Sequence, residues 1–284
     1  MKIRSKVTII ATATICALFS TSCSNESNYS AGNKVTPLTK EGVVAAEQAD
    51  ATAKSDSSGE FFKKGQSLDL YIVMDKSGSL WEYRSNDDKK FPGSDPQCLR
   101  LLALVDLIEK LGAELNNGEE VRLNVVTFGS FATNVGSIRN PASMGRENLA
   151  SVLKDDICSK PNKENRDTIY SKALEKISLT LSEQRKVEKM DVETAIFFSD
   201  GAARDENTDD LKNAIAEFNS AFPNRAYGVL LGNTEDKCKI TNAAGQELTT
   251  TECITEVVGG DPNRVVQSAN AAKLSETMIQ LLSK

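Results

Sequence analysis

Residues 68–79 read Leu-Asp-Leu-Tyr-Ile-Val-Met-Asp-Lys-Ser-Gly-Ser, and this stretch decides the fold. Its first part is almost continuously apolar, which is typical of a strand buried on both faces of a parallel sheet. Its last part is small and polar, as expected of a loop that leaves such a strand. We therefore expect Asp75, Ser77 and Ser79 to follow the carboxyl end of a central strand.

The chain after this strand alternates between strand-like and helix-like segments. Alternation of this kind predicts an α/β fold, with a doubly wound, mostly parallel central sheet flanked by helices on both faces. A Thr-rich insertion at 234–258 interrupts the pattern. In such sheets ligands bind beyond the carboxyl ends of the strands. The expected strands are 121–128, 131–138, 194–198, 226–231 and 265–266, and the expected helices are 98–115, 147–157, 168–181, 209–222 (with Thr208 as N-cap) and 271–282.

The composition excludes several classes of function. The 284 residues include no histidine, which excludes Ser-His-Asp and Cys-His catalysis as well as histidine-based zinc or haem sites. We find no other acid/base pair at a useful spacing, so we predict that the protein is not an enzyme. The net charge is −6, without a basic stripe, which argues against nucleic-acid binding.

The N-terminus predicts export and a lipid anchor. A basic stub precedes an uncharged segment, 7–19, that is too short to span a membrane, so we interpret residues 1–22 as a signal peptide. Small residues directly before Cys23 resemble a lipoprotein cleavage box, although Ser20 stands where Leu is usual. The expected organisation is a lipidated Cys23, a flexible linker through residue 60 and one folded domain over 61–284. The protein would then sit in a bacterial cell envelope, on the periplasmic face or the cell surface.

Two further boundaries carry oxygen-bearing side chains. The strand predicted at 194–198 is followed by Ser-Asp-Gly at 199–201, and a helix is expected to begin near Asp167 and Thr168. These positions gather with the first loop if the strands are parallel. The plain structural alternative is that they only cap turns and helices.

At these residues the sequence resembles the von Willebrand factor A family, which includes integrin I domains. Asp75, Ser77 and Ser79 match the family's Asp-x-Ser-x-Ser motif, Thr168 matches its helix-leading threonine, and Asp200 matches its Ser/Thr-Asp-Gly motif. The resemblance covers about residues 66–284.

The resemblance implies a metal-ion-dependent adhesion site. Ser77, Ser79 and Thr168 would offer hydroxyl oxygens to one divalent cation, with Asp75 and Asp200 acting largely through bound water. An all-oxygen set of this kind suits Mg²⁺, and Mn²⁺ or Ca²⁺ less selectively. A protein partner would then supply an Asp or Glu carboxylate as a further ligand. The alternative function is an envelope scaffold in which the metal only stabilises the loops.

The loop at 80–95 departs from the family pattern because it is long and polar. It contains Trp81, which is either part of a docking surface or buried.

Four cysteines remain once Cys16 and Cys23 are set aside: Cys98, Cys158, Cys238 and Cys253. An even number in an exported chain predicts two disulfides, and three pairings are possible. We favour Cys238–Cys253, which would close the insertion as a hairpin, and Cys98–Cys158, which would brace the loops of the metal site.

Overall fold

The computed structural model describes residues 65–81, 83–84, 90–115, 119–162, 164–205, 207–232, 237–241 and 244–283. The predicted signal peptide, Cys23 and the linker lie outside these residues. Within the described part, no helix is both long and apolar enough to cross a membrane.

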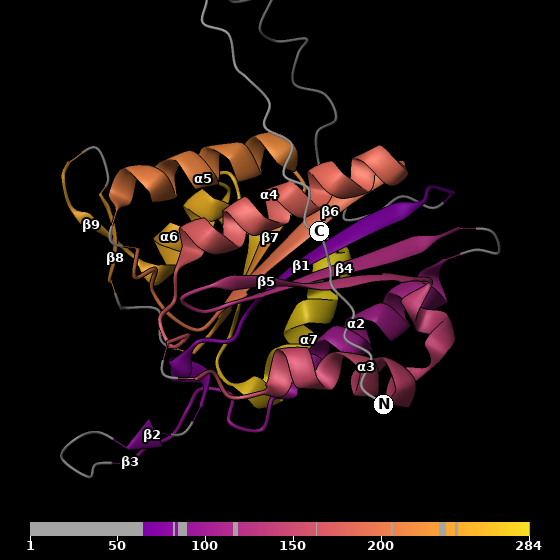
Figure 1. The fold of residues 1–284 in the computed structure, drawn as a ribbon, viewed down its shortest axis with the longest axis horizontal. Coiled ribbons are helices and arrows are strands. Elements are labelled where there is room, and N and C mark those ends of the chain that lie inside the picture. Colours follow the sequence, from indigo (N-terminus) through magenta and orange to yellow (C-terminus); the bar gives the residue numbers. More distant parts are fainter. Residues whose placement is uncertain are drawn as a thin grey trace, which may run out of the picture. The chain divides into compact units, whose positions relative to one another are not determined.

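A sheet of six strands in the order β10-β7-β6-β1-β4-β5 forms the centre of the domain (Figure 1). All neighbouring strands are parallel except β5, which runs antiparallel to β4 at one edge. This confirms the predicted fold class. The strands are β1 (Leu68–Asp75), β4 (Val121–Phe128), β5 (Ala132–Arg139), β6 (Val192–Ser199), β7 (Ala226–Leu231) and β10 (Val265–Ser268).

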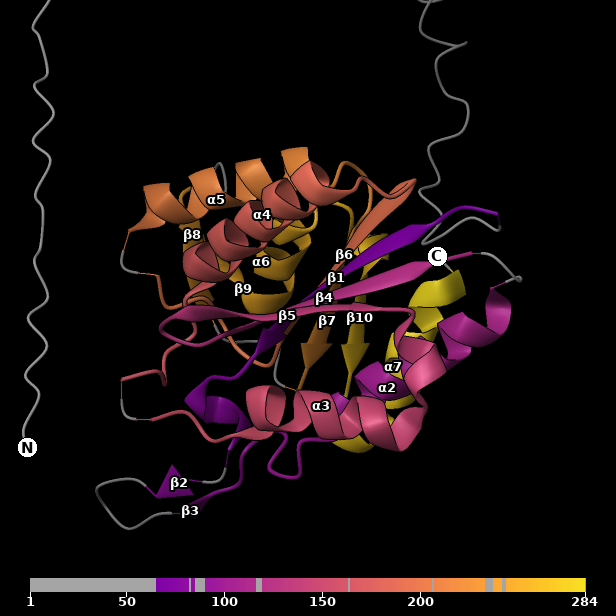
Figure 2. The same cartoon turned by 45° about the vertical axis from the view of Figure 1, so that its right-hand side comes forward.

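Helices cover both faces of this sheet (Figure 2). Side chains alternate across β1, so Leu70 and Ile72 pack toward one layer while Tyr71 and Val73 pack toward the other. One layer comprises α2 (Leu99–Glu114), α3 (Arg146–Cys158) and α7 (Leu274–Ile279), and the other α4 (Tyr170–Val187), α5 (Thr208–Ala221) and α6 (Thr250–Val257).

The winding direction of the chain changes at β1. Helix α2 joins β1 to β4 across one face, whereas α4 precedes β6 on the other face, and β4 and β6 flank β1 on opposite sides. The chain therefore changes direction at β1, which is the point where open α/β sheets form ligand sites beyond their carboxyl ends.

Short elements complete the described chain. The loop after β1 contains a 3-10 turn, η1 (Gly78–Leu80), and a small hairpin of β2 (Tyr83–Arg84) and β3 (Lys90–Phe91), which stands out from the sheet in Figure 1. The remaining elements are η2 (Pro141–Met144), β8 (Lys237–Thr241), β9 (Glu247–Thr249), η3 (Pro262–Arg264), η4 (Ala271–Lys273) and η5 (Gln280–Ser283).

The insertion contains more regular structure than the sequence analysis expected. Strands β8 and β9 pair as a hairpin, and α6 follows directly. A capping box starts this helix, because Thr249 and Glu252 each bond the other's main-chain N–H. The buried face of α6, which includes Cys253, Ile254 and Val257, then packs into the core. The many threonines concealed this apolar spacing.

Candidate functional site

The carboxylate of Asp75 lies at the end of β1 and is fully buried. Its Oδ1 accepts a hydrogen bond from the main-chain N–H of Ser77 at 2.7 Å. Its Oδ2 accepts one from the hydroxyl of Ser199, the last residue of β6, at 2.6 Å. Asp75 therefore ties the loop after β1 to the end of the neighbouring strand.

The two serine hydroxyls of the same loop converge on Asp200. The Oγ atoms of Ser77 and Ser79 are 3.0 Å apart, and Ser79 Oγ donates to Asp200 Oδ1 at 2.8 Å. Ser77 and Asp200 are buried, whereas Ser79 is exposed. Four of the five predicted residues thus form one hydrogen-bonded cluster with one side open to solvent.

Main-chain hydrogen bonds bring Thr168 to the same edge. Gly78 N–H donates to the carbonyl of Arg166 at 2.8 Å, and Arg204 N–H donates to the carbonyl of Thr168 at 2.8 Å. The segment that carries Thr168 is therefore bonded to the loops after β1 and β6. Thr168 itself is buried, and it precedes the helix, because α4 begins at Tyr170 and not near Asp167 as the sequence predicted.

Ser94 is a member of this cluster that the sequence analysis missed. Its hydroxyl donates a short hydrogen bond to Asp200 Oδ2, so both oxygens of that carboxylate are held by serines. Main-chain bonds fix its position, since Ser94 N–H donates to the carbonyl of Ser79 at 3.1 Å. Gly93 allows this approach, because a Cβ there would lie 2.3 Å from the carbonyl oxygen of Leu80. No local sequence signal marks Ser94 apart from its neighbour Gly93.

A second supporting residue is Asp205, whose side chain is almost fully buried. Its carboxylate accepts the N–H groups of Tyr170 and Ser171, both at 2.9 Å, and so caps the start of α4 from a distant loop. Asn207, rather than the predicted Thr208, is the N-cap of α5. Asp205 and Asn207 are thus both occupied in helix capping.

The base of the long loop after β1 is held by a buried ion pair. Asp95 and Arg100 are both fully buried, with Oδ2 to Nη1 at 2.7 Å. Arg100 also donates to the carbonyl of Ile157 at 2.8 Å and lies 5.1 Å from the ring centroid of Trp81. Trp81 is buried, so of the two readings left open for this side chain the structure shows the buried one.

A disulfide joins Cys98 to Cys158, as the sequence analysis favoured. Cys98 precedes α2 and Cys158 ends α3, so the bond links these helices three residues after Asp95. The disulfide thereby holds the loop that carries Ser94 against α3.

The second favoured disulfide is not formed in the structure. Cys238 and Cys253 are free, buried thiols. Main-chain pairing of β8 with β9 closes the hairpin instead, and Cys253 lies beyond it on α6. The bridge is therefore not needed to close the insertion.

The pKa values of the two carboxyl groups in the cluster are both raised. Burial raises the pKa of Asp75, against the lowering effect of its hydrogen bonds from Ser199 and Ser77. Burial, followed by the nearby charge of Asp75, raises the pKa of Asp200 to about 7. A cation placed between two buried carboxylates with raised pKa values would stabilise both as anions.

The residues present fit a hard divalent cation. Hydroxyl and carboxylate oxygens of the loops after β1 and β6 meet where Ser79 is exposed, and Mg²⁺ commonly keeps several waters beside such ligands. The described residues, this site included, contain no group of three acidic or cysteine side chains that could hold a metal ion, so a cation here would depend on hydroxyl oxygens beside two carboxylates.

Comparison with solved structures identifies the fold. Proximal thread matrix protein 1 from the mussel byssus matches with a TM-score of 0.50 and 12% identity, over 78% of this chain and 48% of that one. The pilus adhesin SpaC from Lactobacillus rhamnosus GG matches with a TM-score of 0.52 and 11% identity, over 78% and 31%. A von Willebrand factor type A protein from Catenulispora acidiphila matches with a TM-score of 0.49 and 14% identity, over 77% and 42%.

This chain therefore has a von Willebrand factor A-like fold, and it spans less than half the length of each of these three proteins. One solved form of the mussel protein has a zinc-occupied metal-ion-dependent adhesion motif. No protein-family model matches the sequence, and no curated protein matches it.

Proposed function

We propose that this chain, with its von Willebrand factor A-like fold, is a metal-ion-dependent protein-binding module tethered to a bacterial membrane. The observation that carries the proposal is the cluster at the end of β1, in which Asp75, Ser77, Ser79 and Asp200 are bonded to one another beside Thr168. The zinc-occupied motif of the mussel protein, which shares the fold, supports a divalent cation here.

In this proposal the hydroxyls of Ser77, Ser79 and Thr168 bind Mg²⁺ or Mn²⁺ directly. Asp75 and Asp200 hold water molecules around the ion and offset part of its charge. Because only two carboxylates face a dication, the site keeps a positive character and accepts an Asp or Glu of a protein partner. The cation supplies the charge that attracts this carboxylate, and the chain supplies the orientation of the ligands.

An exposed aromatic side chain beside the cluster supports a docking surface. Phe131 is 60% exposed and follows β4, and its N–H donates to Asn165 at 2.9 Å. The loop that carries it also bonds the segment before α4, since Ile169 N–H donates to the carbonyl of Gly129. Aromatic residues are enriched at protein interfaces, so Phe131 is placed to contact a partner held at the metal.

Titration calorimetry with Mg²⁺ and Mn²⁺ tests the metal site. The wild-type protein should bind one cation, and Asp75→Ala should remove the binding signal. Asp155→Ala, which removes an exposed carboxylate on α3, is the matched control and should bind as the wild type does. Absence of any metal-dependent heat in the wild type would defeat the proposal.

Pull-down from envelope extracts, with and without EDTA, separates binding from scaffolding. A binding module loses its partner in EDTA and in Asp75→Ala, and Phe131→Ala weakens capture without changing metal affinity. In the alternative, an envelope scaffold with a structural metal, Asp75→Ala lowers the melting temperature and leaves the captured proteins unchanged.

The lipid anchor at Cys23 and the location in the cell envelope belong to the same proposal, and so does the absence of enzymatic activity. The anchor and the location depend on the sequence before residue 65, which is outside the described residues, whereas the absence of enzymatic activity is argued from the lack of histidine in the whole sequence. The structural relatives that are adhesins or matrix proteins support an extracellular binding role without naming a partner.

A further inference from the structure

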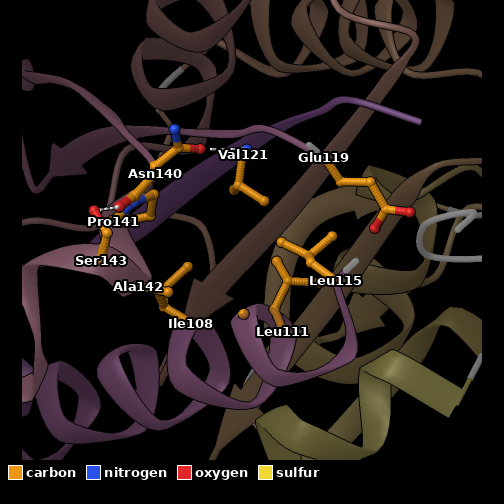
Figure 3. A pocket seen from close by; sticks show the side chains of 10 residues that line it. Ile108, Leu111, Leu115, Glu119, Val121, Asn140, Pro141, Ala142 and Ser143 are labelled. Carbon is orange, nitrogen blue, oxygen red and sulfur yellow. Dashed lines mark hydrogen bonds between the residues drawn. The ribbon is translucent and has the colours of Figure 1, made fainter. Parts of the chain in front are cut away.

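A cavity of about 290 Å³ lies at the end of the sheet opposite the candidate metal site. It is built at the start of β4 and the end of β5, against the C-terminal part of α2 (Figure 3). Figure 3 shows the side chains of Leu111, Leu115 and Val121 on one side and the 140–143 segment on the other. The lining residues are Ile108, Leu111, Gly112, Leu115, Glu119, Val121, Asn140, Pro141, Ala142 and Ser143.

Six of the ten lining residues of the cavity are apolar, and the cavity is reached from solvent. Leu111 and Val121 are buried, whereas Leu115 is only half-buried and Ser143 is exposed. Its inner wall is tightly packed, because a Cβ on Gly112 would lie 2.5 Å from Cβ of Ala142. An accessible apolar hollow of this kind is suited to an apolar side chain.

Glu119 is the single ionisable group among the described residues that line this cavity, and it is bonded to the start of the described chain. Its side chain accepts a hydrogen bond from the N–H of Gly65. The residues directly before Gly65 are Phe61-Phe62-Lys63-Lys64, which lie outside the described residues. Phe62 is three residues away from Gly65, so an extended chain places it within about 10 Å of that N–H.

We propose that Phe61 and Phe62 dock into this cavity. Their rings would pack against the apolar residues that line the cavity, and Lys63 and Lys64 would bring positive charge to the rim that carries Glu119. The chain before residue 61 contains one other aromatic residue after Cys23, Tyr29, which is too far along the chain to be held by Gly65.

The docked segment would determine where the tether leaves the domain. β1 starts beside β4, with Leu68 paired to Val121, so both this cavity and the chain entry lie at the amino ends of the strands. The candidate metal site lies at their carboxyl ends. A tether held at the cavity would therefore leave the domain at the end of the sheet opposite the candidate metal site. This inference does not depend on the metal site.

Limited trypsin digestion of the full chain, followed by mass spectrometry, tests the proposal. Cleavage after Lys63 and Lys64 is compared with cleavage after Lys34 and Lys40, which lie farther along the same N-terminal segment and serve as the internal reference. Proteolysis reports the open population when closing is fast. The double variant Phe61→Ala/Phe62→Ala should raise the relative cleavage rate after Lys63 and Lys64 about tenfold, and Tyr29→Ala should leave it unchanged.

A cavity variant completes the test. Leu115→Lys places a charge at the half-buried wall and should raise the same cleavage rate, while thermal melting verifies that the domain remains folded. If the rings occupy the cavity, combining Leu115→Lys with the two Phe→Ala changes gives no further increase. The proposal is overturned if the double Phe→Ala variant is cleaved like the wild type. It is equally overturned if the two sets of changes act additively, which would mean another occupant, such as a second copy of the chain.

Discussion

At the scale of single residues, the candidate site depends on how Asp200 is held. Ser79 donates to one of its oxygens and Ser94 to the other, while the nearby charge of Asp75 opposes its ionisation. The serines therefore orient the carboxyl group, and the group attracts a cation only when it has lost its proton. Orientation and protonation can be tested separately.

The affinity for Mg²⁺ should depend on pH because the cation competes with a proton. The pKa of Asp200 is raised to about 7, so the metal-free site is largely protonated below that pH. Metal binding requires the ionised form, and the apparent affinity should rise about tenfold between pH 6 and pH 8 if this one group dominates. Calorimetry in buffers of different ionisation enthalpy measures both the affinity and the released proton.

In metal-free protein, the free energy of unfolding should change with pH in the opposite direction to the Mg²⁺ affinity. Because the carboxyl pKa is higher in the folded state than in the unfolded state, the folded chain binds more protons, and stability falls as pH rises from about 4 to 7. A melting temperature in EDTA that rises over this range, together with a pH-independent Mg²⁺ affinity, would contradict the assignment.

Ser94→Ala should weaken metal binding without removing any proposed ligand. The variant deprives Asp200 of a hydrogen bond that lowers its pKa, so the carboxyl holds its proton to higher pH and loses its orientation. Loss of such an outer partner typically costs 10- to 100-fold in metal affinity. Ser151→Ala, an exposed serine on α3, is the matched control. Equal affinities for the two variants would show that Ser94 has no role at the site.

The sequence predicted the residues of the site that belong to local motifs and missed those that arrive from elsewhere. Asp75 ends β1, and Ser77, Ser79 and Asp200 follow strand ends within a few residues; the structure brings all four together at hydrogen-bond distance. Ser94 reaches the cluster only through a loop whose path depends on Gly93 packing against Leu80. Such a path follows from tertiary packing, which local spacing does not encode.

At the scale of elements, the central strands carry a buried charged network. Arg122 on β4 donates to both oxygens of Asp69 on β1, through Nε at 2.6 Å and through Nη2. Asn124 and Tyr71 also donate to this carboxylate, at 3.0 and 3.1 Å. Arg122 is 2% exposed and Asp69 is 0% exposed, so neither charge can turn to water. The network fixes the register of β1 against β4.

Breaking this pair on one side should destabilise the fold strongly. Arg122→Leu leaves Asp69 as an uncompensated buried charge, which typically costs about 3–5 kcal/mol. The control is Arg139→Leu on β5, whose partners Glu120 and Glu188 are about half exposed, and for which about 1 kcal/mol or less is expected. Urea unfolding measures both. Similar losses of unfolding free energy for the two variants would show that the buried ion pair stabilises the fold no more than the exposed one.

Element type was predictable from apolar spacing, and element ends were less so. The strands near 121–128, 194–198 and 226–231 were predicted to within two residues, because buried parallel strands have continuous apolar runs. Helix α4 starts later than predicted, since Asp205 from another loop caps it at Tyr170. The predicted helix at 271–282 is divided into η4, α7 and η5.

At the scale of the whole molecule, the fold separates two ends of one sheet. The candidate metal site lies at the carboxyl ends of β1 and β6, and the described chain enters at the amino end of β1. With the proposed N-terminal anchor, the chain would enter the domain at the end of the sheet opposite the candidate site.

The proposed attachment makes a prediction about the mature chain. If Cys23 becomes the acylated N-terminus, mass spectrometry of protein purified from the envelope should find a lipid-modified residue there and no residues 1–22. Cys23→Ser should remove the anchor, since a single lipid chain already shifts a protein toward the membrane and the acylated terminus carries more than one. The protein should then move from the membrane pellet to the soluble fraction with an unchanged melting temperature, because the folded domain begins more than 40 residues later. Ser24→Ala is the matched control and should remain in the pellet. An unmodified N-terminus in the wild type would mean ordinary cleavage near Ser22 and a protein without a lipid anchor. Membrane retention of Cys23→Ser would mean that something other than the lipid holds the chain at the membrane.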